Sequence, residues 1–285
     1  MDIPKHSELN SDNYTDFNAK MINKWIDEEQ YWGPVTSHEE YIKAQNGEWE
    51  IGLAFDEIPK EWFSPYINLG NNRLDGVKLL GLAGGGGQQM PILSASGADC
   101  TIMDYSDSQL ACEKLVAERE GYKINIVKAD MTKRFPFDDN SFDIIYHPVS
   151  NHFIEDVYHV WNECYRVLKT GGILLAGMEN GIMYIFDENY DDENENAQLI
   201  AVNQLPFNPL KDPILYDELM AMNNDYNLMF SHSMEEQICG QIKSGFILTD
   251  LTEAKDPNSL ISKYCPEYIS TRAVKPKLPL NELLK

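Results

Sequence analysis

The chain has 285 residues, of which 43% are apolar, 24% charged and 11% aromatic. This composition is typical of a globular protein and excludes a disordered tail, a collagen-like chain and a disulfide scaffold. Lys and Arg number 23 against 46 Asp and Glu, which gives a net charge of −23. Such a surface repels phosphate backbones and anionic lipids, so nucleic acids and membranes are not expected as partners.

The N-terminal stretch MDIPKHSELNSDNY has no cationic segment followed by an apolar one, and the sequence holds no run of about 18 uncharged apolar residues. We therefore expect a soluble, cytoplasmic protein. The five cysteines are odd in number, scattered and without a CxxC pair, which disfavours a disulfide framework and a structural zinc site. No metal site is expected, since the histidine spacings around residues 147–159 also lack a complete ligand set.

The first 73 residues are rich in aromatic side chains scattered among helix formers. Ser37 followed by Glu40 is a capping box, which predicts a helix beginning near His38. From Val77 onward, short apolar runs alternate with helical stretches, a pattern typical of parallel strands joined by crossover helices. The predicted strands are Val77–Leu82, Cys100–Asp104, Ile124–Ala129, Phe142–His147, Ile173–Gly177, Phe246–Leu251 and Tyr268–Val274. The predicted helices between them are Gln89–Ser96, Asp107–Glu120 and Asp156–Leu168.

About fifty residues after Asn180 lack clear strand character, until Ser233 and Glu236 form another capping box. The helix that this box opens is expected to end near Gly245. The whole pattern predicts an α/β fold: a Rossmann-like, seven-stranded, mostly parallel sheet with helices on both faces. We expect an N-terminal helical and aromatic segment over residues 1–73 and a main domain over residues 74–285, with an insertion at residues 180–232.

The segment LLGLAGGGGQQ, residues 79–89, runs from an apolar strand into four consecutive glycines and then into a helix. Glycines at the carboxyl end of a strand let backbone N–H groups approach a ligand, so a cofactor site is predicted here. The spacing GxGxxG of a dinucleotide-binding loop is absent. Asp104 ends the second strand, where a carboxylate can accept hydrogen bonds from both hydroxyls of a ribose.

Five segments in this order and spacing resemble the class I S-adenosylmethionine (SAM)-dependent methyltransferases. They are the glycine loop, Asp104 at the end of the second strand, KADM (residues 128–131), FPFDDNSFDIIYH (residues 135–147) and RVLKTGGILL (residues 166–175). The resemblance covers about a hundred residues, from Val77 to Gly177. It implies SAM as the cofactor and S-adenosylhomocysteine as the product.

The resemblance also implies roles for individual residues. Gly85 and Gly87 would let the loop pass under the methionyl part of the cofactor, and Asp104 would bind the ribose. Tyr105, Asp130 and Met131 would contact the adenine, and His147 would border the methionine part. Further members of the implied cofactor set are Ala83, Gly84 and Gln89.

One position departs from the family pattern, in which an acidic residue precedes the glycines. Gly81 stands there in this sequence, so the carboxylate that ordinarily helps to fix the amino end of the cofactor is missing. A substitute acceptor is then needed, or the affinity for the cofactor falls.

Methyl transfer requires an aligned nucleophile, exclusion of water and, for an acceptor atom that carries a proton, a base. We favour His152, in the segment that follows the fourth strand, as the possible base, with a hydrogen-bonded loop histidine as the alternative. Tyr31 and Trp32 are candidates for the substrate wall, through closure over the cofactor or a cation–π surface, although packing against the sheet is the commoner role. Both the N-terminal segment and the insertion are expected to form a lid over a small-molecule pocket.

The sequence thus predicts an enzyme, a SAM-dependent methyltransferase that acts on a small-molecule acceptor. An alternative from another class is a non-catalytic protein that keeps the nucleoside cleft and acts through a protein partner. A nicotinamide-dependent dehydrogenase is disfavoured by the missing GxGxxG spacing. Neither the methyl acceptor nor the oligomeric state can be predicted from the sequence.

Overall fold

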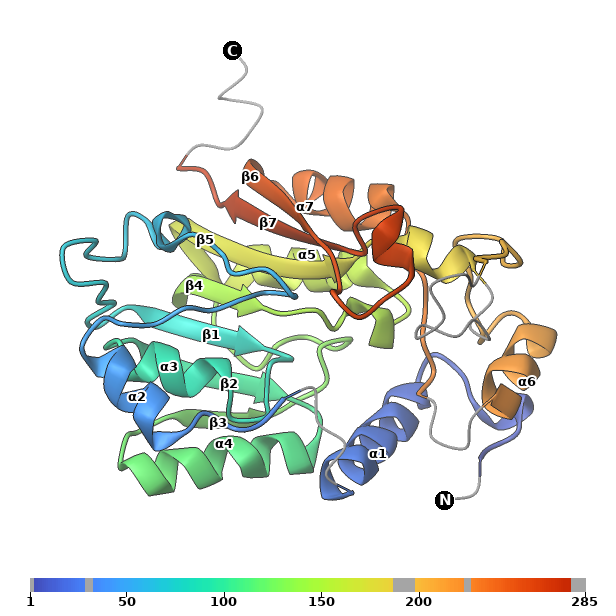
Figure 1. Cartoon of the computed structure of the whole chain (residues 1–285), viewed down its shortest axis with the longest axis horizontal. Helices are drawn as coiled ribbons and strands as arrows, with labels where there is room; N and C mark the ends of the chain where they lie inside the picture. Colours follow the sequence, from blue (N-terminus) through green and yellow to red (C-terminus); the bar gives the residue numbers. More distant parts are fainter. Residues whose placement is uncertain (1–2, 29–32, 187–197, 223–226, 278–285) are drawn as a thin grey trace, which may run out of the picture.

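The computed structural model describes residues 3–28, 33–186, 198–222 and 227–277 of the chain. Its centre is one sheet of seven strands (Figure 1). The strands are β1 (Lys78–Leu82), β2 (Asp99–Asp104), β3 (Asn125–Lys128), β4 (Phe142–His147), β5 (Leu168–Glu179), β6 (Ile247–Ala254) and β7 (Tyr268–Val274).

The strand order is β3-β2-β1-β4-β5-β7-β6. Pairing is parallel from β3 through β5, and β7 is antiparallel to both of its neighbours. The order reverses between β1 and β4, and open α/β sheets bind ligands at such a reversal, beyond the carboxyl ends of the strands. The predicted Rossmann-like, mostly parallel sheet is confirmed.

The helices follow the expected alternation with the strands. The α-helices are α1 (Tyr14–Asp27), α2 (His38–Gln45), α3 (Gln89–Ala95), α4 (Asp107–Glu120), α5 (Val157–Val167), α6 (Pro213–Met222) and α7 (Gly240–Lys243). Short 3-10 turns are η1 (His6–Glu8), η2 (Lys60–Phe63), η3 (Asn151–Phe153), η4 (Gly181–Ile185) and η6 (Ile261–Lys263), and η5 (Glu235–Cys239) is a π-helical turn. Within the described ranges, none of the helices has the length and apolar character needed to cross a membrane.

Local signals set several of these boundaries. The Ser37 hydroxyl accepts the Glu40 N–H at 3.2 Å, as the capping box predicts, so α2 begins at His38. Helix α4 ends at Gly121, which adopts a φ of +74° as its C-cap residue. The Ser233 box also forms, but the helix that it opens contains the π-helical turn η5 before α7.

The strand β5 is longer than predicted, since it extends from Leu168 to Glu179 and not from Ile173 to Gly177. The antiparallel partner β7 explains the extension at the carboxyl end, because it pairs with β5 as far as Glu179, which faces Tyr268. A strand that follows β5 by almost a hundred residues thus decides where β5 ends. A local apolar pattern cannot show this.

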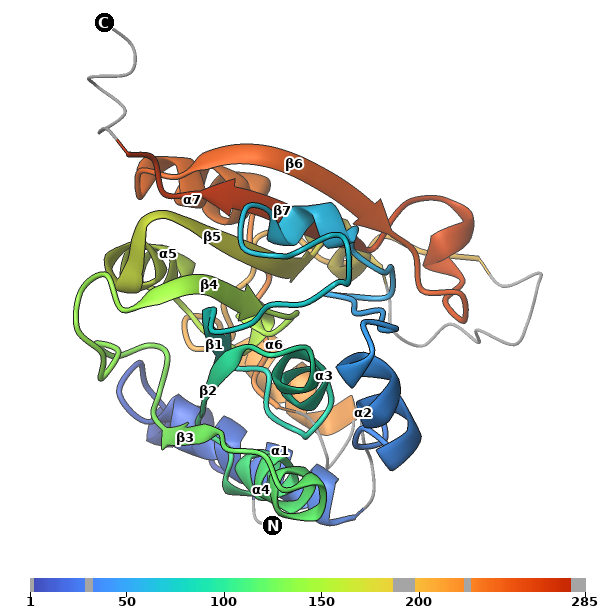
Figure 2. The same ribbon diagram turned by 90° about the vertical axis from the view of Figure 1, so that its left-hand side faces the viewer.

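Helices lie on both faces of the sheet (Figure 2), and a cluster of apolar side chains packs against each face. The first contains residues of α3 and of the N-terminal segment, among them Trp49, Trp62 and Phe63, packed against one face. The second contains residues of α5 together with Phe246, packed against the other. Residues 41–67 of the N-terminal segment are therefore part of the main core.

A third apolar cluster lies at the carboxyl ends of the strands, where α1 and α6 are adjacent (Figure 1). Tyr14 and Phe17 of α1 pack there with Tyr216 of α6 and with Phe230. The side chain of Asn18 adds two hydrogen bonds to the backbone of Leu228, at 2.9 and 2.8 Å. The N-terminal helix and the insertion are thus joined to each other over the edge at which the ligand site is expected.

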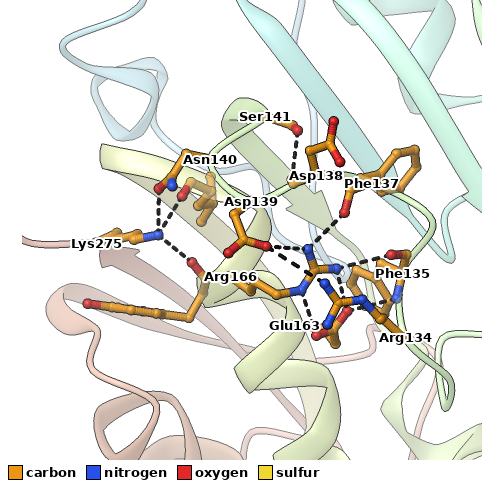
Figure 3. Close-up of polar contacts among 12 residues, drawn as sticks. Arg134, Phe135, Phe137, Asp138, Asp139, Asn140, Ser141, Glu163, Arg166 and Lys275 are labelled. Atoms are coloured by element: carbon orange, nitrogen blue, oxygen red, sulfur yellow. Dashed lines mark hydrogen bonds and ion pairs between the residues drawn. The ribbon is translucent and has the colours of Figure 1, made fainter.

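The connection that leads into β4 is fixed by one arginine (Figure 3). Arg166 of α5 donates to the carbonyls of Phe135 and Phe137 and forms ion pairs with Glu163 and Asp139 at 2.7 and 2.8 Å. Next to it, Nζ of Lys275 donates hydrogen bonds to the carbonyls of Tyr165 and Leu168 at the end of α5. The arginine of the RVLK segment therefore has a structural role.

Candidate functional site

A cavity of about 650 Å³ opens at the carboxyl ends of the strands. The turn after β1 and the ends of β2, β3 and β4 form one side of it, and α1 with residues 52–55 forms another. Glu179, Met229 and Tyr268 complete the wall. Nine predicted site residues line this cavity: Ala83, Gly84, Gly85, Gln89, Asp104, Tyr105, Asp130, Met131 and His152.

The glycine loop approaches β2 so closely that a side chain would not fit. The N–H of Gly85 donates to Oδ2 of Asp104 at 3.1 Å. A Cβ atom at Gly85 would lie 2.8 Å from Cβ of Gln109 and 3.0 Å from Oδ2 of Asp104. Ala83, just before the glycines, has a φ of +47°, a conformation that costs free energy for a residue with a side chain. The loop is therefore a tight cradle.

The structure explains why glycine stands at position 81. A Cβ atom there would lie 2.5 Å from Sδ of Met90 and 3.0 Å from Cδ1 of Ile102. Met90 and Ile102 are both fully buried, so neither can move aside into solvent. An acidic side chain at this position would displace the packing between β1 and α3.

Asp104 and Tyr105 lie together at the end of β2. Asp104 accepts the Ser106 N–H at 2.9 Å in addition to the bond from Gly85. Burial raises the pKa of its carboxyl, and the backbone N–H groups oppose the rise. A carboxylate has about four acceptor positions, so Asp104 keeps capacity for a ligand hydroxyl. Tyr105 donates to Asp16 of α1 at 2.5 Å, which connects the cavity wall to the N-terminal helix.

Asp130 and Met131 occupy the loop after β3. Asp130 accepts hydrogen bonds from the hydroxyls of Thr15 and Thr132, each at 2.8 Å. Met131 is almost fully buried and packs in the apolar layer that includes α5. The carboxylate is thus held in place from both α1 and its own loop while its residue lines the cavity.

Gly87 does not line the cavity, although it anchors the loop. Its N–H donates to Oε1 of Glu113 at 2.8 Å, and its carbonyl accepts the Thr36 N–H at 2.7 Å. Glu113 is fully buried on α4, and this burial raises the pKa of its carboxyl to about 8 against the opposing bond from Gly87. Gln88 donates to the carbonyl of Gly33 at 2.7 Å. Hydrogen bonds with both Gly33 and Thr36 therefore hold the glycine loop in place.

His147 also lies outside the cavity wall, in contrast to its predicted position beside the cofactor. Its ring is fully buried, with Nδ1 2.9 Å from the Leu82 carbonyl and Nε2 2.8 Å from Oδ1 of Asn151. Asn151 in turn donates to Gln237 at 2.8 Å. Because both ring nitrogens have protein partners, His147 holds the loop after β4 in place.

His152 lines the cavity and lies close to a residue that the sequence analysis did not identify. Its Nδ1 is 3.2 Å from Oε1 of Glu179, yet the geometry is not that of a hydrogen bond, and this buried nitrogen has no hydrogen-bond partner in the described part of the chain. Burial lowers the pKa of the imidazole to about 3 and raises that of the Glu179 carboxyl to about 7. The imidazole is therefore neutral near pH 7.

Glu179 could have been found by a rule already applied to Asp104, since it too is a polar residue at the carboxyl end of a strand. The predicted end of that strand was two residues short. Thr15 and Asn18 had no such signal, because only tertiary packing brings α1 to the cavity. The predicted substrate residues Tyr31 and Trp32 lie outside the described residues.

Within the described ranges, no group of three or more His, Cys, Asp or Glu side chains is arranged to hold a metal ion.

Residues 80–176 match the family described as a methyltransferase domain. The chain is 37% identical over 259 residues to the uncharacterized methyltransferase YbaJ of Bacillus subtilis, which covers 90% of this chain and 97% of that protein. It is 34% identical over 132 residues to sterol 24-C-methyltransferase erg6 of Aspergillus fumigatus, covering 45% of this chain and 33% of that enzyme. Among solved structures, an S-adenosylmethionine-dependent methyltransferase from Mesorhizobium loti has a TM-score of 0.55 at 18% identity, over 76% of this chain and 98% of that one.

The chain belongs to the class I SAM-dependent methyltransferases, and it is an enzyme with SAM as its cofactor. Its own residues fit this cofactor. The Gly85 cradle leaves no room for a side chain, and the described residues that line the cavity include carboxylates but no Lys or Arg. Such a wall suits a ligand that carries a cationic sulfonium, because no fixed positive charge opposes it.

Proposed function

We propose that the enzyme methylates a small molecule bound in the same cavity as SAM. The observation that carries this proposal is the composition of the cavity wall. It combines the glycine loop, Asp104 and Asp130 with an apolar portion that includes Ile22, Phe55 and other residues far from the cofactor motifs. A concave cavity of several hundred Å³ with apolar walls and a few polar groups is the usual form of a small-molecule site. The sterol specificity in the name of one relative agrees with an acceptor of this class.

Within this proposal, different predicted residues contact different parts of the cofactor. Asp104 binds the ribose, while Tyr105, Asp130 and Met131 contact the adenine. Gly84, Gly85 and Gln89 contact the methionine part. The cofactor supplies an electrophilic methyl carbon, and the remaining task of the protein is to orient the acceptor, exclude water and accept a proton. The predicted base His152 lies on the wall beyond the cofactor loops, but its pKa of about 3 makes its imidazole a weak proton acceptor.

We also propose that the N-terminal segment, residues 1–73, and the insertion, residues 180–232, form a lid on the main domain of residues 74–285, with residues 41–67 anchoring this lid in the core. The shared cluster of α1 and α6 supports this, as does the position of Thr15 and Met229 on the cavity wall. Limited proteolysis with and without S-adenosylhomocysteine tests the lid. Protection of both segments by the ligand is expected, and unchanged digestion would contradict a lid.

We place the enzyme in the cytoplasm. The five cysteines support this compartment, since all are free thiols in the structure.

Calorimetric titration with SAM, S-adenosylhomocysteine and, as a control, NAD tests the cofactor site. Micromolar binding of the first two and none of NAD is expected, and Asp104→Ala should abolish it while the variant keeps its fold by circular dichroism. Methyl transfer is then followed with SAM labelled on the methyl group and a panel of small acceptors. Binding of NAD in place of SAM would overturn the proposed function.

A further inference from the structure

Glu179 is the acidic side chain on the cavity wall that the cofactor roles leave unassigned. It ends β5, its side chain is 12% exposed, and it lies beside His152, whose side chain is 11% exposed. Its second oxygen, Oε2, accepts a hydrogen bond from the hydroxyl of Tyr184 in η4. The carboxyl is thus oriented on one side by a phenol and on the other lies 3.2 Å from an imidazole nitrogen.

The surroundings of this pair decide which chemistry it can perform. Glu179 faces Tyr268 across the β5–β7 pairing, and the Tyr268 ring packs on Phe55 with centroids 5.0 Å apart. All three residues line the cavity. This end of the cavity therefore presents an aromatic surface next to a carboxyl, with no Lys or Arg among its described wall residues.

We infer that Glu179, oriented by Tyr184 and paired with His152, takes the proton from the nucleophilic atom of the acceptor. The acceptor accordingly carries an O–H or N–H group on an uncharged or cationic molecule with an apolar body. This inference rests on the proposed function and deepens it.

The step balances without a further reactant. The X–H bond of the acceptor breaks, its electron pair stays on X (oxygen or nitrogen) and forms the new X–CH₃ bond, and the proton passes to Oε1 of Glu179. The electron pair of the former S–CH₃ bond stays on sulfur. His152 stays neutral throughout, with Nδ1 3.2 Å from Oε1 of Glu179.

The titration of Glu179 fits a proton acceptor at neutral pH. Burial raises its pKa to about 7, opposed first by the Tyr184 hydrogen bond and then by the nearby His232. A base whose pKa lies near the working pH combines ionisation with proton affinity. The titratable groups that face it are His152 from η3, Tyr184 from η4, Tyr268 from β7 and His232 from the segment before η5.

The first test is independent of the acceptor. The side-chain carboxyl of Glu179 is followed by ¹³C NMR in the full chain without cofactor, with the signal assigned by its absence in Glu179→Gln. We expect a midpoint near 7 and a His152 imidazole that stays neutral down to about pH 5. Tyr184→Phe removes a bond to the ionised form and should move the midpoint upward, whereas Tyr66→Phe, which loses a bond to the Gly171 carbonyl, should leave it unchanged.

The second test uses labelled SAM with two matched pairs of acceptors: para-cresol against para-hydroxybenzoate, and benzylamine against para-(aminomethyl)benzoate. Each pair differs by one carboxylate. We expect methylation of the members without the carboxylate, and a loss of roughly 10²–10⁴-fold in turnover with Glu179→Gln at unchanged calorimetric affinity for SAM.

A midpoint near the ordinary value of about 4.3 for a glutamic acid, or an unchanged midpoint in Tyr184→Phe, would overturn the role of Glu179. Methylation of only the carboxylate-bearing acceptors, or of none of the four, would overturn the acceptor class. Calorimetric titration with SAM distinguishes a failure of this inference from a failure of the proposed function. If SAM binds and Glu179 titrates near 4.3, only the present inference fails.

Discussion

The hydroxyl of Thr15 donates to Oδ2 of Asp130 across 2.8 Å and so joins the N-terminal helix α1 to the loop after β3. Both residues line the cavity. The bond also brings a residue from the first turn of α1 to a carboxylate that follows it by more than a hundred positions. The cavity wall is thus assembled from the ends of the sheet strands and from the N-terminal helix.

Replacing Thr15 with Val is expected to weaken SAM binding about fivefold, because one hydrogen bond that orients Asp130 contributes on the order of 1 kcal/mol. Isothermal calorimetry measures the change. Ser11→Ala is the control, since the Ser11 hydroxyl donates to Glu155 on the exposed side of the same segment. Equal affinities for the Thr15 variant and the native chain would separate α1 from cofactor binding.

Gly85→Ala is expected to reduce SAM affinity by about tenfold or more, since overpacking at a tight contact costs about 1–3 kcal/mol. The added methyl would meet Gln109 and Asp104 and push the loop away from β2. Gly70→Ala is the matched control, because its Cβ would meet only Oδ1 of Asn68 at 3.2 Å. If Gly85→Ala binds SAM with native affinity, the loop can shift to accommodate the added methyl group, which would contradict the tight contact in the structure.

Glu113 makes the stability of the protein depend on pH in an unusual direction. Its folded-state pKa of about 8 lies above the unfolded value, so between the two the folded chain binds more protons. The contribution of Glu113 to stability is therefore full at low pH and is lost as pH rises through about 8. Glu113→Gln keeps an acceptor for Gly87 and avoids this loss.

The expected result is that Glu113→Gln gains stability relative to the native chain as pH rises from about 5 to 9, by on the order of 1–3 kcal/mol. Urea denaturation at a series of pH values measures the difference. For Glu118→Gln, an exposed change on the same helix, the stability difference from the native chain should not change with pH. If the stability difference of Glu113→Gln is also independent of pH, the buried carboxyl does not titrate in this range.

Arg166→Met is expected to cost about 3–5 kcal/mol, because it leaves the largely buried Glu163 without its cationic partner and frees two carbonyls. Arg134→Met provides the comparison in the same neighbourhood (Figure 3). The Arg134 side chain is 73% exposed and its guanidinium lies 3.9 Å from Asp139, so its loss should stay within about 0.5 kcal/mol. Denaturant melts of both variants measure the costs, and similar losses would contradict a structural role specific to Arg166.

Several elements could be predicted from the chain because their signals are local. Asp107–Glu120 begins at a serine cap and ends at Gly121, and the helix observed has these bounds. Phe142–His147 and Tyr268–Val274 are likewise observed as predicted. The cofactor loops also carry their own signal, since a glycine run or an aspartate directly after an apolar strand marks the ligand edge of a parallel sheet.

The positions of single side chains did not follow from such rules. His147 and His152 stand in one short segment and were both expected at the cavity, yet only His152 lines it. The backbone turn at η3 and the contact with Asn151 decide this difference, and neither is visible in residue type or spacing.

The sequence by itself determined the sheet, its crossover helices and the cofactor motifs, because apolar periodicity, caps and glycines act over a few neighbouring residues. Only the tertiary structure decided that α1 forms a wall of the cavity, that β7 extends β5 to Glu179, and that Glu179 lies beside His152. These relationships join segments far apart in the chain, and they arise from the packing of apolar faces and antiparallel pairing, which local patterns do not encode.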